Sequence, residues 1–374
     1  MRHLFEIPDD LAYFNCASLA PQLRSVRAAG EAALARRAAP WTIRAEDWFT
    51  ETETLRARFA QLIGGDADGV ALIPATSYGL AVAARNVAGS EGDRALLIAD
   101  DYPSNVYTWR AWSRRTGAEI VTVRRDDDRT WTDSILAALD ERVRVVAVPN
   151  VHWTDGSLID LVRVGEGARA VGARLVVDVT QSAGAMPFDL APVRPDYLVA
   201  AGYKWLLGPF SVAYLFVAED HRSGQPIEEN WINRAGSEDF AGLTAYTDEY
   251  RPGARRFDVG QRTNFTLTPM AIAGLDQLLD WGVETVAATL DGVTGGIEAA
   301  ARERGLDAVP AAQRGPHMLG ISLPADRRAE IGAQLAAAKV FVGMRGSVMR
   351  VSPHLHVTQA DVDRLFAALD RALR

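Results

Sequence analysis

One lysine lies in the middle of a long apolar stretch of the chain. The segment YLVAAGYKWLLGPFSVAYLFVA, from Tyr197 to Ala218, contains a single charged side chain, that of Lys204. Apolar surroundings disfavour the charged form of an amine and lower its pKa from the ordinary value of about 10.4. The neutral amine can act as a nucleophile and as a base, so this stretch predicts a reactive lysine.

Polar residues also follow three other apolar runs of the kind that form buried strands. Thr76 and Ser77 come after VALIP, Asn150 comes after VRVVAVP, and Asp178 comes after RLVV, with Gln181 three residues further on. In open α/β sheets, ligands bind beyond the carboxyl ends of the strands. Thr76 and Ser77 open a helix, where hydroxyls and backbone N–H groups can hold a phosphate. Taken singly, these residues equally fit helix caps and turns.

Together, these residue types match the needs of one cofactor, pyridoxal 5′-phosphate. It requires a phosphate cradle, a carboxylate that keeps its pyridine nitrogen protonated, and a lysine amine that binds it as a Schiff base. Thr76 and Ser77, then Asp178, then Lys204 occur in that order along the chain. The combination predicts a pyridoxal phosphate site with Lys204 and Asp178 as catalytic residues.

Strand-like runs alternate with helical patterns from about residue 70 to residue 217. The runs are β-branched and almost continuously apolar, which is typical of strands buried on both faces of a mostly parallel sheet. Seven strands are predicted, at Val70–Ala75, Ala95–Asp100, Glu119–Val123, Val143–Asn150, Arg174–Val179, Asp196–Ala201 and Val212–Val217. Helices are predicted at Gly79–Val87, Tyr107–Thr116, Thr132–Glu141 and Leu161–Val171. The expected fold class is α/β, with one seven-stranded sheet covered by helices.

The chain is long enough for two domains with separate cores. Residues 1–45, with a helix near Leu23–Ala39, are predicted to pack with the smaller domain. Residues 46–265 are predicted to form the large cofactor-binding domain. Residues 266–374 are predicted to form a smaller α+β domain, with helices at Pro269–Trp281 and Thr358–Leu373.

Composition argues against several classes of function. The formal net charge of -8 provides no broad basic field, so we expect no nucleic-acid partner. The single cysteine, Cys16, allows no intrachain disulfide and no cysteine-rich zinc site, and we predict no metal. Lys204, Gly208 and Pro209 disfavour a membrane span in the apolar stretch, and no secretory signal is recognisable. We therefore expect a cytoplasmic protein without a membrane partner.

The sequence resembles the class V aminotransferase group of fold-type I pyridoxal phosphate enzymes, which includes cysteine desulfurases, isopenicillin N epimerase and kynureninase. The similarity is carried by LVVDVTQSAGAMPFDL, which holds Asp178 and Gln181, and by the lysine segment AGYKWLLGP. DYPSNVYTW is similar to the family segment whose aromatic residue stacks on the cofactor ring. The resemblance implies that Tyr102 is the stacking residue and belongs to the catalytic residues. The resemblance also implies that Asn150 and Gln181 contact the phenolic oxygen of the cofactor and that Tyr203 reaches its phosphate.

A second resemblance within this family concerns the subunit arrangement. RFDVGQRTNF, residues 256–265, is similar to a loop that crosses to the partner's site in family dimers. The resemblance therefore implies a homodimer. It also makes four residues candidates for binding phosphate or substrate in the partner's site, namely Gln261, Arg262, Thr263 and Asn264.

The substrate carboxylate is expected to meet an arginine near the end of the chain. GMRGSVMRVSPHLHVT is similar to the family segment whose arginine holds this group, with Arg350 as the better match and Arg345 as the second. A planar fork of N–H donors suits a carboxylate. His152 follows a predicted strand in a loop and is a further candidate to face the substrate, although packing explains it equally well.

The reaction type stays open at the level of sequence. RGSVM stands where desulfurases carry a reactive cysteine, so a persulfide mechanism is not expected. Ala201 and Tyr203 replace the serine and histidine that flank the desulfurase lysine. We expect an enzyme that acts on an amino acid, with transamination first, a kynureninase-like or C–S lyase reaction second and epimerisation third. A catalytically silent cofactor-binding protein is the remaining alternative.

Overall fold

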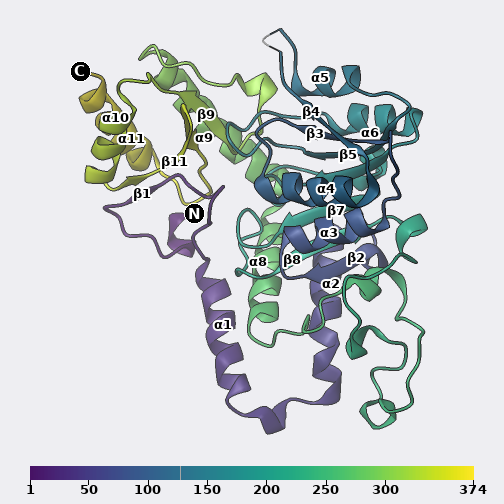
Figure 1. Cartoon of the computed structure of the whole chain (residues 1–374). Coiled ribbons are helices and arrows are strands. Elements are labelled where there is room, and N and C mark those ends of the chain that lie inside the picture. The colour runs from purple at the N-terminus through teal and green to yellow at the C-terminus, as the bar shows by residue number, and fades with distance from the viewer. Residues whose placement is uncertain (127) are drawn as a thin grey trace.

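The computed structural model describes residues 1–126 and 128–374. Its centre is a seven-stranded sheet in the spatial order β2-β8-β7-β6-β5-β3-β4, on the right of Figure 1. The strands are β2 (Val70–Ile73), β3 (Arg94–Ile98), β4 (Glu119–Val123), β5 (Val143–Pro149), β6 (Arg174–Asp178), β7 (Tyr197–Ala201) and β8 (Ala213–Val217). Each coincides with a predicted run to within two residues at either end, so the predicted sheet is confirmed.

One strand of this sheet runs against the others. β8 is antiparallel to both of its neighbours, β2 and β7, whereas every other pair is parallel. The apolar stretch around Lys204 therefore forms two buried strands, β7 and β8, joined by a turn. Because β2 points the same way as β7, the carboxyl ends of the remaining strands all meet at one edge of the sheet. This edge is where ligands bind in open α/β sheets.

Helices cover both faces of the sheet, which therefore has two cores. They are α3 (Thr76–Asn86), α4 (Pro103–Thr116), α5 (Trp131–Ala137), α6 (Leu161–Ala170) and α7 (Leu190–Val193). The side chains of Thr130 and Asp160 cap the first turns of α5 and α6. The neighbouring residues Leu96 and Leu97 of β3 lie in different cores, as the alternation of side chains along a strand requires.

A second, smaller sheet lies at the upper left of Figure 1. It consists of three antiparallel strands in the order β11 (Gly343–Arg345), β12 (Val348–Val351) and β9 (Leu319–Ser322). Helices α10 (Arg328–Ala337) and α11 (Gln359–Leu373) share a separate core with it. The N-terminal segment joins this unit, because β1 (Ala12–Tyr13) pairs with β10 (Val340–Phe341). The smaller α+β part of the fold is confirmed.

Four long helices connect the two sheets. α1 (Arg24–Arg37) and α2 (Thr50–Leu62) both pack against α8 (Leu267–Trp281), and α9 (Val283–Arg302) contributes to the cores of both sheets. Helix α2 was not predicted, because its sequence TETETLRARFAQL is mostly polar. The domain boundaries at residues 45 and 265 stay predictions. No helix in residues 1–126 and 128–374 combines the length and the apolar character that a bilayer crossing needs.

A buried ion pair fastens α2 to the large sheet. The guanidinium of Arg56 donates to both carboxylate oxygens of Asp258, at 2.9 and 2.7 Å, and both side chains are fully buried. Asp258 also accepts the backbone N–H of Leu72 in β2, at 2.7 Å. The guanidinium of Arg262 lies 2.9 Å from the same carboxylate. Removal of this carboxylate would take the nearest counter-charge from two buried cations and leave Arg56 with the more distant carboxylate of Glu53, at 3.5 Å.

Replacing Asp258 with Ala is expected to lower the free energy of unfolding by about 3–5 kcal/mol, because the buried guanidinium groups of Arg56 and Arg262 lose their nearest counter-charge. Urea denaturation of the wild type and the variant measures this loss. Asp276→Ala is the matched control, since it breaks a half-exposed ion pair with Arg58 and should cost less than about 1 kcal/mol. Equal losses in the two variants would contradict the structural role of Asp258.

Candidate active site

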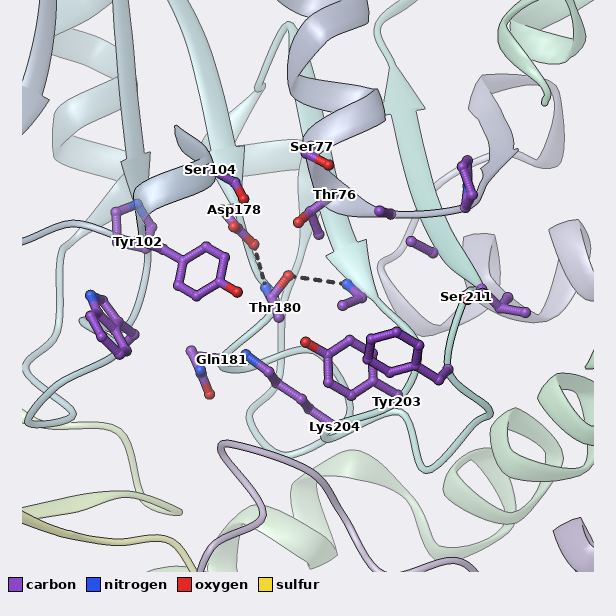
Figure 2. Close-up of a pocket in the computed structure, with 18 of the residues that line it drawn as sticks. Thr76, Ser77, Tyr102, Ser104, Asp178, Thr180, Gln181, Tyr203, Lys204 and Ser211 are labelled. Atoms are coloured by element: carbon purple, nitrogen blue, oxygen red, sulfur yellow. Dashed lines mark hydrogen bonds between the residues drawn. The ribbon is translucent and has the colours of Figure 1, made fainter. Parts of the chain in front are cut away.

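A cavity lies at the edge of the large sheet where the carboxyl ends of the strands meet (Figure 2). It has a volume of about 180 Å³, and its walls come from the segments after β2, β3, β5, β6 and β7 and from the turn before β8. Seven residues named from the sequence line this one cavity, namely Thr76, Ser77, Tyr102, Asp178, Gln181, Tyr203 and Lys204.

Lys204 reaches into the cavity from the turn between β7 and β8 (Figure 2). The turn is tight, because a Cβ on Gly202 would come within 2.7 Å of the carbonyl oxygen of Val212. The Nζ atom lies 5.3 Å from the centre of the Tyr102 ring and 5.6 Å from that of Tyr203. The amine is thus held between two aromatic rings.

Burial controls the charge of Lys204. The residue is only 5% exposed, and desolvation lowers the pKa of its amine to about 8. The negative charge of Asp178 opposes this shift, whereas the positive charges of Arg350 and Arg345 add to it. A substantial fraction of the amine is therefore neutral just below pH 8, in the form that acts as nucleophile and base.

Asp178 ends β6 and is half-buried in the cavity wall. Its Oδ1 accepts the backbone N–H of Thr180 at 2.8 Å, and the Thr180 hydroxyl accepts the backbone N–H of Ala201 at 3.0 Å (Figure 2). Desolvation raises the pKa of Asp178, against the hydrogen bonds from Thr180 and the charge of Lys204. A cation beside this carboxylate would lower its pKa and keep it ionised.

The first turn of α3 forms another wall of the cavity. Its N-cap residue, Ala75, has no side-chain acceptor, so no side chain caps the first backbone N–H groups. Thr76 and Ser77 are the first two residues of the helix, and both line the cavity (Figure 2). Gly79 lets the helix lie close to the sheet, because a Cβ there would come within 2.6 Å of Val199 Cγ1. Such a helix start is suited to a phosphate group.

Two tyrosines and one amide side chain also line the cavity. Tyr102 is the N-cap residue of α4, and Tyr203 directly precedes the lysine. The side-chain amide of Gln181 donates to the carbonyl of Ala17 at 3.1 Å, and its oxygen accepts from the indole N–H of Trp205 at 3.0 Å. An amide nitrogen carries two hydrogens, so one remains for a ligand in the cavity.

Asn150 and His152 lie outside the cavity wall. Asn150 is buried, and its side-chain oxygen accepts the hydroxyl of Ser182 at 2.7 Å. His152 is also buried, stacks on Trp131 with 5.3 Å between ring centres, and lines a neighbouring cleft. The ligand contacts predicted for these two residues stay predictions.

Arg350 is buried next to the cavity but does not line it. It lies on β12, and its guanidinium donates to the Trp153 carbonyl at 2.6 Å and to the Ser18 hydroxyl at 2.9 Å. Arg345, on β11, donates to the same hydroxyl at 3.2 Å. Desolvation and the charge of Arg345 lower the pKa of Arg350 to about 9. The small sheet thus brings both predicted arginines to Trp153 in the cavity wall, and their role stays a prediction.

The loop at 256–265 does not line the cavity of its own chain. Arg262 is buried in the ion-pair cluster beneath α2. The Thr263 hydroxyl donates to the carbonyl of Trp48 at 2.5 Å, and the side-chain oxygen of Asn264 accepts backbone N–H groups in the first turn of α8. Their predicted contacts with a partner's site remain predictions.

Four polar wall residues were missed in the sequence, namely Asp101, Ser104, Thr180 and Ser211. Thr180 lies between Asp178 and Gln181, so its position in DVTQ could have indicated it. Asp101 and Ser104 belong to DYPSN, which follows β3, and only the tyrosine of that segment was singled out. Burial raises the pKa of Asp101 to about 6, which makes it a second perturbed carboxyl group in the wall.

The fold and cavity define a class of protein, the fold-type I pyridoxal phosphate enzymes. The cystine C–S lyase C-DES, solved as a mutant with glycine covalently linked to the pyridoxal phosphate cofactor, has a TM-score of 0.90 at 16% identity, over 100% of this chain and 99% of that one. A cysteine desulfurase from Thermococcus onnurineus gives 0.85 at 16% identity, over 100% and 97% of the two chains. The predicted fold class is confirmed.

Sequence comparison identifies the family. Residues 33–285 match the aminotransferase class-V family, and the chain belongs to this family. An uncharacterized aminotransferase, YcbU of Bacillus subtilis, is 28% identical over 83% of this chain and 81% of its own length. A kynureninase from Deinococcus radiodurans is 31% identical over 74% of this chain and 66% of its own length. The predicted family and pyridoxal phosphate as its cofactor are confirmed.

The amine of Lys204 is expected to titrate with a midpoint near pH 8, because burial lowers its pKa to about 8. Limited acetylation of cofactor-free protein over a pH series, followed by mass spectrometry of the Lys204 peptide, measures this midpoint. Lys339, the only other lysine, is exposed and provides an internal reference. A midpoint near the ordinary value of about 10.4 would show that the amine is not desolvated.

Asp178→Asn should move the same midpoint to lower pH. The carboxylate favours the ammonium form of Lys204, so its removal leaves the desolvation unopposed. The acetylation series on the variant gives the comparison. An unchanged or higher midpoint would mean that the two charged groups do not sense each other.

Proposed function

We propose that this cavity binds pyridoxal 5′-phosphate and that the protein uses it to transform an amino acid. The observation that carries the proposal is the meeting of Lys204, Asp178 and Tyr102 with the first turn of α3 in one cavity. An amine, a carboxylate, an aromatic ring and an uncapped helix start come together there from four separate segments of the chain.

The residues of the cavity fit the groups that the cofactor presents. Thr76 and Ser77 would hold the phosphate at the start of α3, with the hydroxyl of Tyr203 as a further donor. Gln181 would use its free amide hydrogen for the phenolic oxygen, with Asn150 as the second predicted contact on that side. Two glycines support this fit, Gly79 in the first turn of α3 and Gly202 in the turn after β7. A side chain at either position would collide with neighbouring atoms and displace the cavity wall.

Three side chains act on the reacting groups. When bound, pyridoxal phosphate supplies an electron-withdrawing ring that stabilises negative charge at the α-carbon of the substrate. Asp178 would accept a hydrogen bond from the ring nitrogen and hold the proton there. Lys204 would bind the cofactor through its amine and, when free, would take the proton from the α-carbon of the substrate. Tyr102 would pack against the ring and limit its orientation.

Transamination is the reaction that we propose first, supported by the family and by the similarity to an aminotransferase over most of the chain. A kynureninase-like hydrolysis is the second candidate, supported by the 31% identity with a kynureninase. A cysteine persulfide plays no part in the proposal, because Cys16 is buried and burial raises the pKa of its thiol. Epimerisation is the third candidate.

We further propose a cytoplasmic homodimer in which residues 256–265 complete the partner's site. Arg262, Thr263 and Asn264 would then bind phosphate or substrate across the subunit boundary. The loop-rich segment between β8 and α8 supports this arrangement, because it exposes large apolar side chains such as Tyr246, which is 93% exposed. A single buried thiol fits a reducing compartment.

Lys204→Ala is expected to abolish covalent attachment of the cofactor and to lower the turnover rate by about 10²–10⁴-fold or more, because the nucleophile and the base are lost together. Borohydride reduction followed by mass spectrometry of the intact protein detects the attached cofactor. Lys339→Ala is the control, because this lysine lies on the surface, and the variant should keep both the attached cofactor and the turnover rate. Unchanged attachment in the Lys204 variant would overturn the proposed site.

The reaction type is expected to show in the products formed from a panel of L- and D-amino acids. Transamination yields an oxo acid and leaves the amino group on the protein-bound cofactor. Release of ammonia, sulfide or a side-chain fragment would favour the lyase or hydrolase, and conversion between L and D forms would favour the epimerase. Chiral chromatography with mass spectrometry separates these outcomes.

A further inference from the structure

A wider cleft adjoins the cofactor cavity. It is lined by the segments after β3, β4 and β5 and by the hairpin of β11 and β12, so it lies between the two sheets. Asp101 and Trp153 line both hollows and form the wall that they share. Three arginines line the cleft, namely Arg124, Arg125 and Arg345. Three carboxylates also line it, those of Asp100, Asp101 and Asp155. A substrate side chain that leaves the cavity past Trp153 therefore enters a space lined by charges of both signs.

Two of the arginines near this wall meet at one hydroxyl group. Arg345 donates to Ser18 Oγ at 3.2 Å and otherwise only to the carbonyl of its neighbour Met344. Arg350 donates to the same Ser18 Oγ at 2.9 Å and to the carbonyl of Trp153 at 2.6 Å. Two positive charges therefore lie side by side, which is unfavourable unless an anion is brought to them.

The carboxylates of the cleft do not neutralise this pair. Asp155 accepts hydrogen bonds from its own loop and lies 3.6 Å from a ring nitrogen of His152. Asp101 accepts hydrogen bonds from the first turn of α4. Within the described ranges, neither Arg345 nor Arg350 makes an ion pair with a carboxylate. Arg350 is fully buried, and its Nε–H has no hydrogen-bond partner in this part of the chain.

Ser18 lies where its hydroxyl can donate a hydrogen bond to an anion held by the two arginines. A hydroxyl has two acceptor lone pairs and one O–H donor. The two arginines occupy the acceptor positions of Ser18, so its O–H must point toward a third group. Ser18 thus orients both guanidinium groups, and its own O–H stays available as a donor to a further group.

The two guanidinium groups contact different parts of Trp153. Arg345 lies over its ring, 5.3 Å from the centre, and lines the cleft. Arg350 binds its backbone carbonyl and lines neither hollow. A single substrate carboxylate bound at Arg350 would leave the positive charge of Arg345 unpaired. A second anionic group of the substrate, on the cleft side of Trp153, would pair with that charge.

We propose that the substrate is a dicarboxylic amino acid, with its α-carboxylate at Arg350 and its side-chain carboxylate at Arg345. This inference rests on the proposed function, because it concerns the same site. Arg345 is then the residue that selects the substrate class, and Ser18 is a positioning residue that orients both arginines. A neutral side chain of the same length would leave the charge of Arg345 unbalanced.

Binding of simple acids to the cofactor-loaded enzyme tests the inference without turnover. Isothermal titration calorimetry gives dissociation constants for the dicarboxylates glutarate and succinate. It also gives those for valerate and butyrate, the monocarboxylates of the same chain length. We expect the dicarboxylates to bind about tenfold more tightly or better, the effect of one charge-assisted hydrogen-bonded contact. Arg345→Gln should remove this preference while leaving valerate binding unchanged, and Arg345→Lys should restore part of it. Arg110→Gln, on the exposed face of α4, changes the net charge equally and should have no effect.

Each outcome of the titration has one meaning. A preference for dicarboxylates that is lost in Arg345→Gln, in a protein with an unchanged melting temperature, supports the inference. The inference is overturned if dicarboxylates and monocarboxylates bind equally well or if neither kind binds. It is also overturned if the preference for dicarboxylates survives in Arg345→Gln. An equal loss of valerate binding would show that both arginines hold one carboxylate, which also overturns it. Cofactor attachment at Lys204 is measured separately, so failure of the proposed function stays distinguishable.

Discussion

The desolvated amine of Lys204 is the feature on which the rest of the site depends. An ammonium group in an apolar wall is expensive, so the fold must either neutralise it or compensate it. Burial partly neutralises the amine, because it lowers the pKa to about 8. The carboxylate of Asp178 and two aromatic rings lie near the amine and partly compensate its charge. The result is an amine that can change its protonation state near neutral pH, as a nucleophile and base must.

The topology of the large sheet holds these groups together. β8 is the single antiparallel strand, and the turn that leads into it carries Lys204 back over the edge where β2, β5 and β6 end. This arrangement needs small residues at close contacts, such as Gly202 in the turn and Gly79 in α3, where the helix meets the sheet. Two cores, one on each face of the sheet, make the edge rigid. A rigid edge keeps the carboxylate, the amine and the helix start at a constant separation.

The second sheet brings two arginines close to the wall of the cavity. Its β11–β12 hairpin brings Arg345 and Arg350 to Ser18 of the N-terminal segment, and β1 fastens that segment to the same unit. The lysine and the carboxylate of the cavity therefore come from the large sheet, and the two arginines come from the small one. Under the proposed function, this division would let the substrate preference change through the smaller sheet while the chemistry of Lys204 and Asp178 stays the same.

The sequence by itself determined the seven strands, the fold class, the family and seven of the residues that line the cavity. These are encoded locally, because buried strands need continuous apolar runs and a charge at the end of such a run stands out. Only the tertiary structure decided which candidates meet. It placed Asn150, His152 and Arg350 outside the cavity wall, brought Thr180 and Asp101 into it, and joined Ser18 to two arginines more than 300 residues away. Contacts between distant segments depend on how helices and sheets pack, and a single sequence carries no local pattern for them.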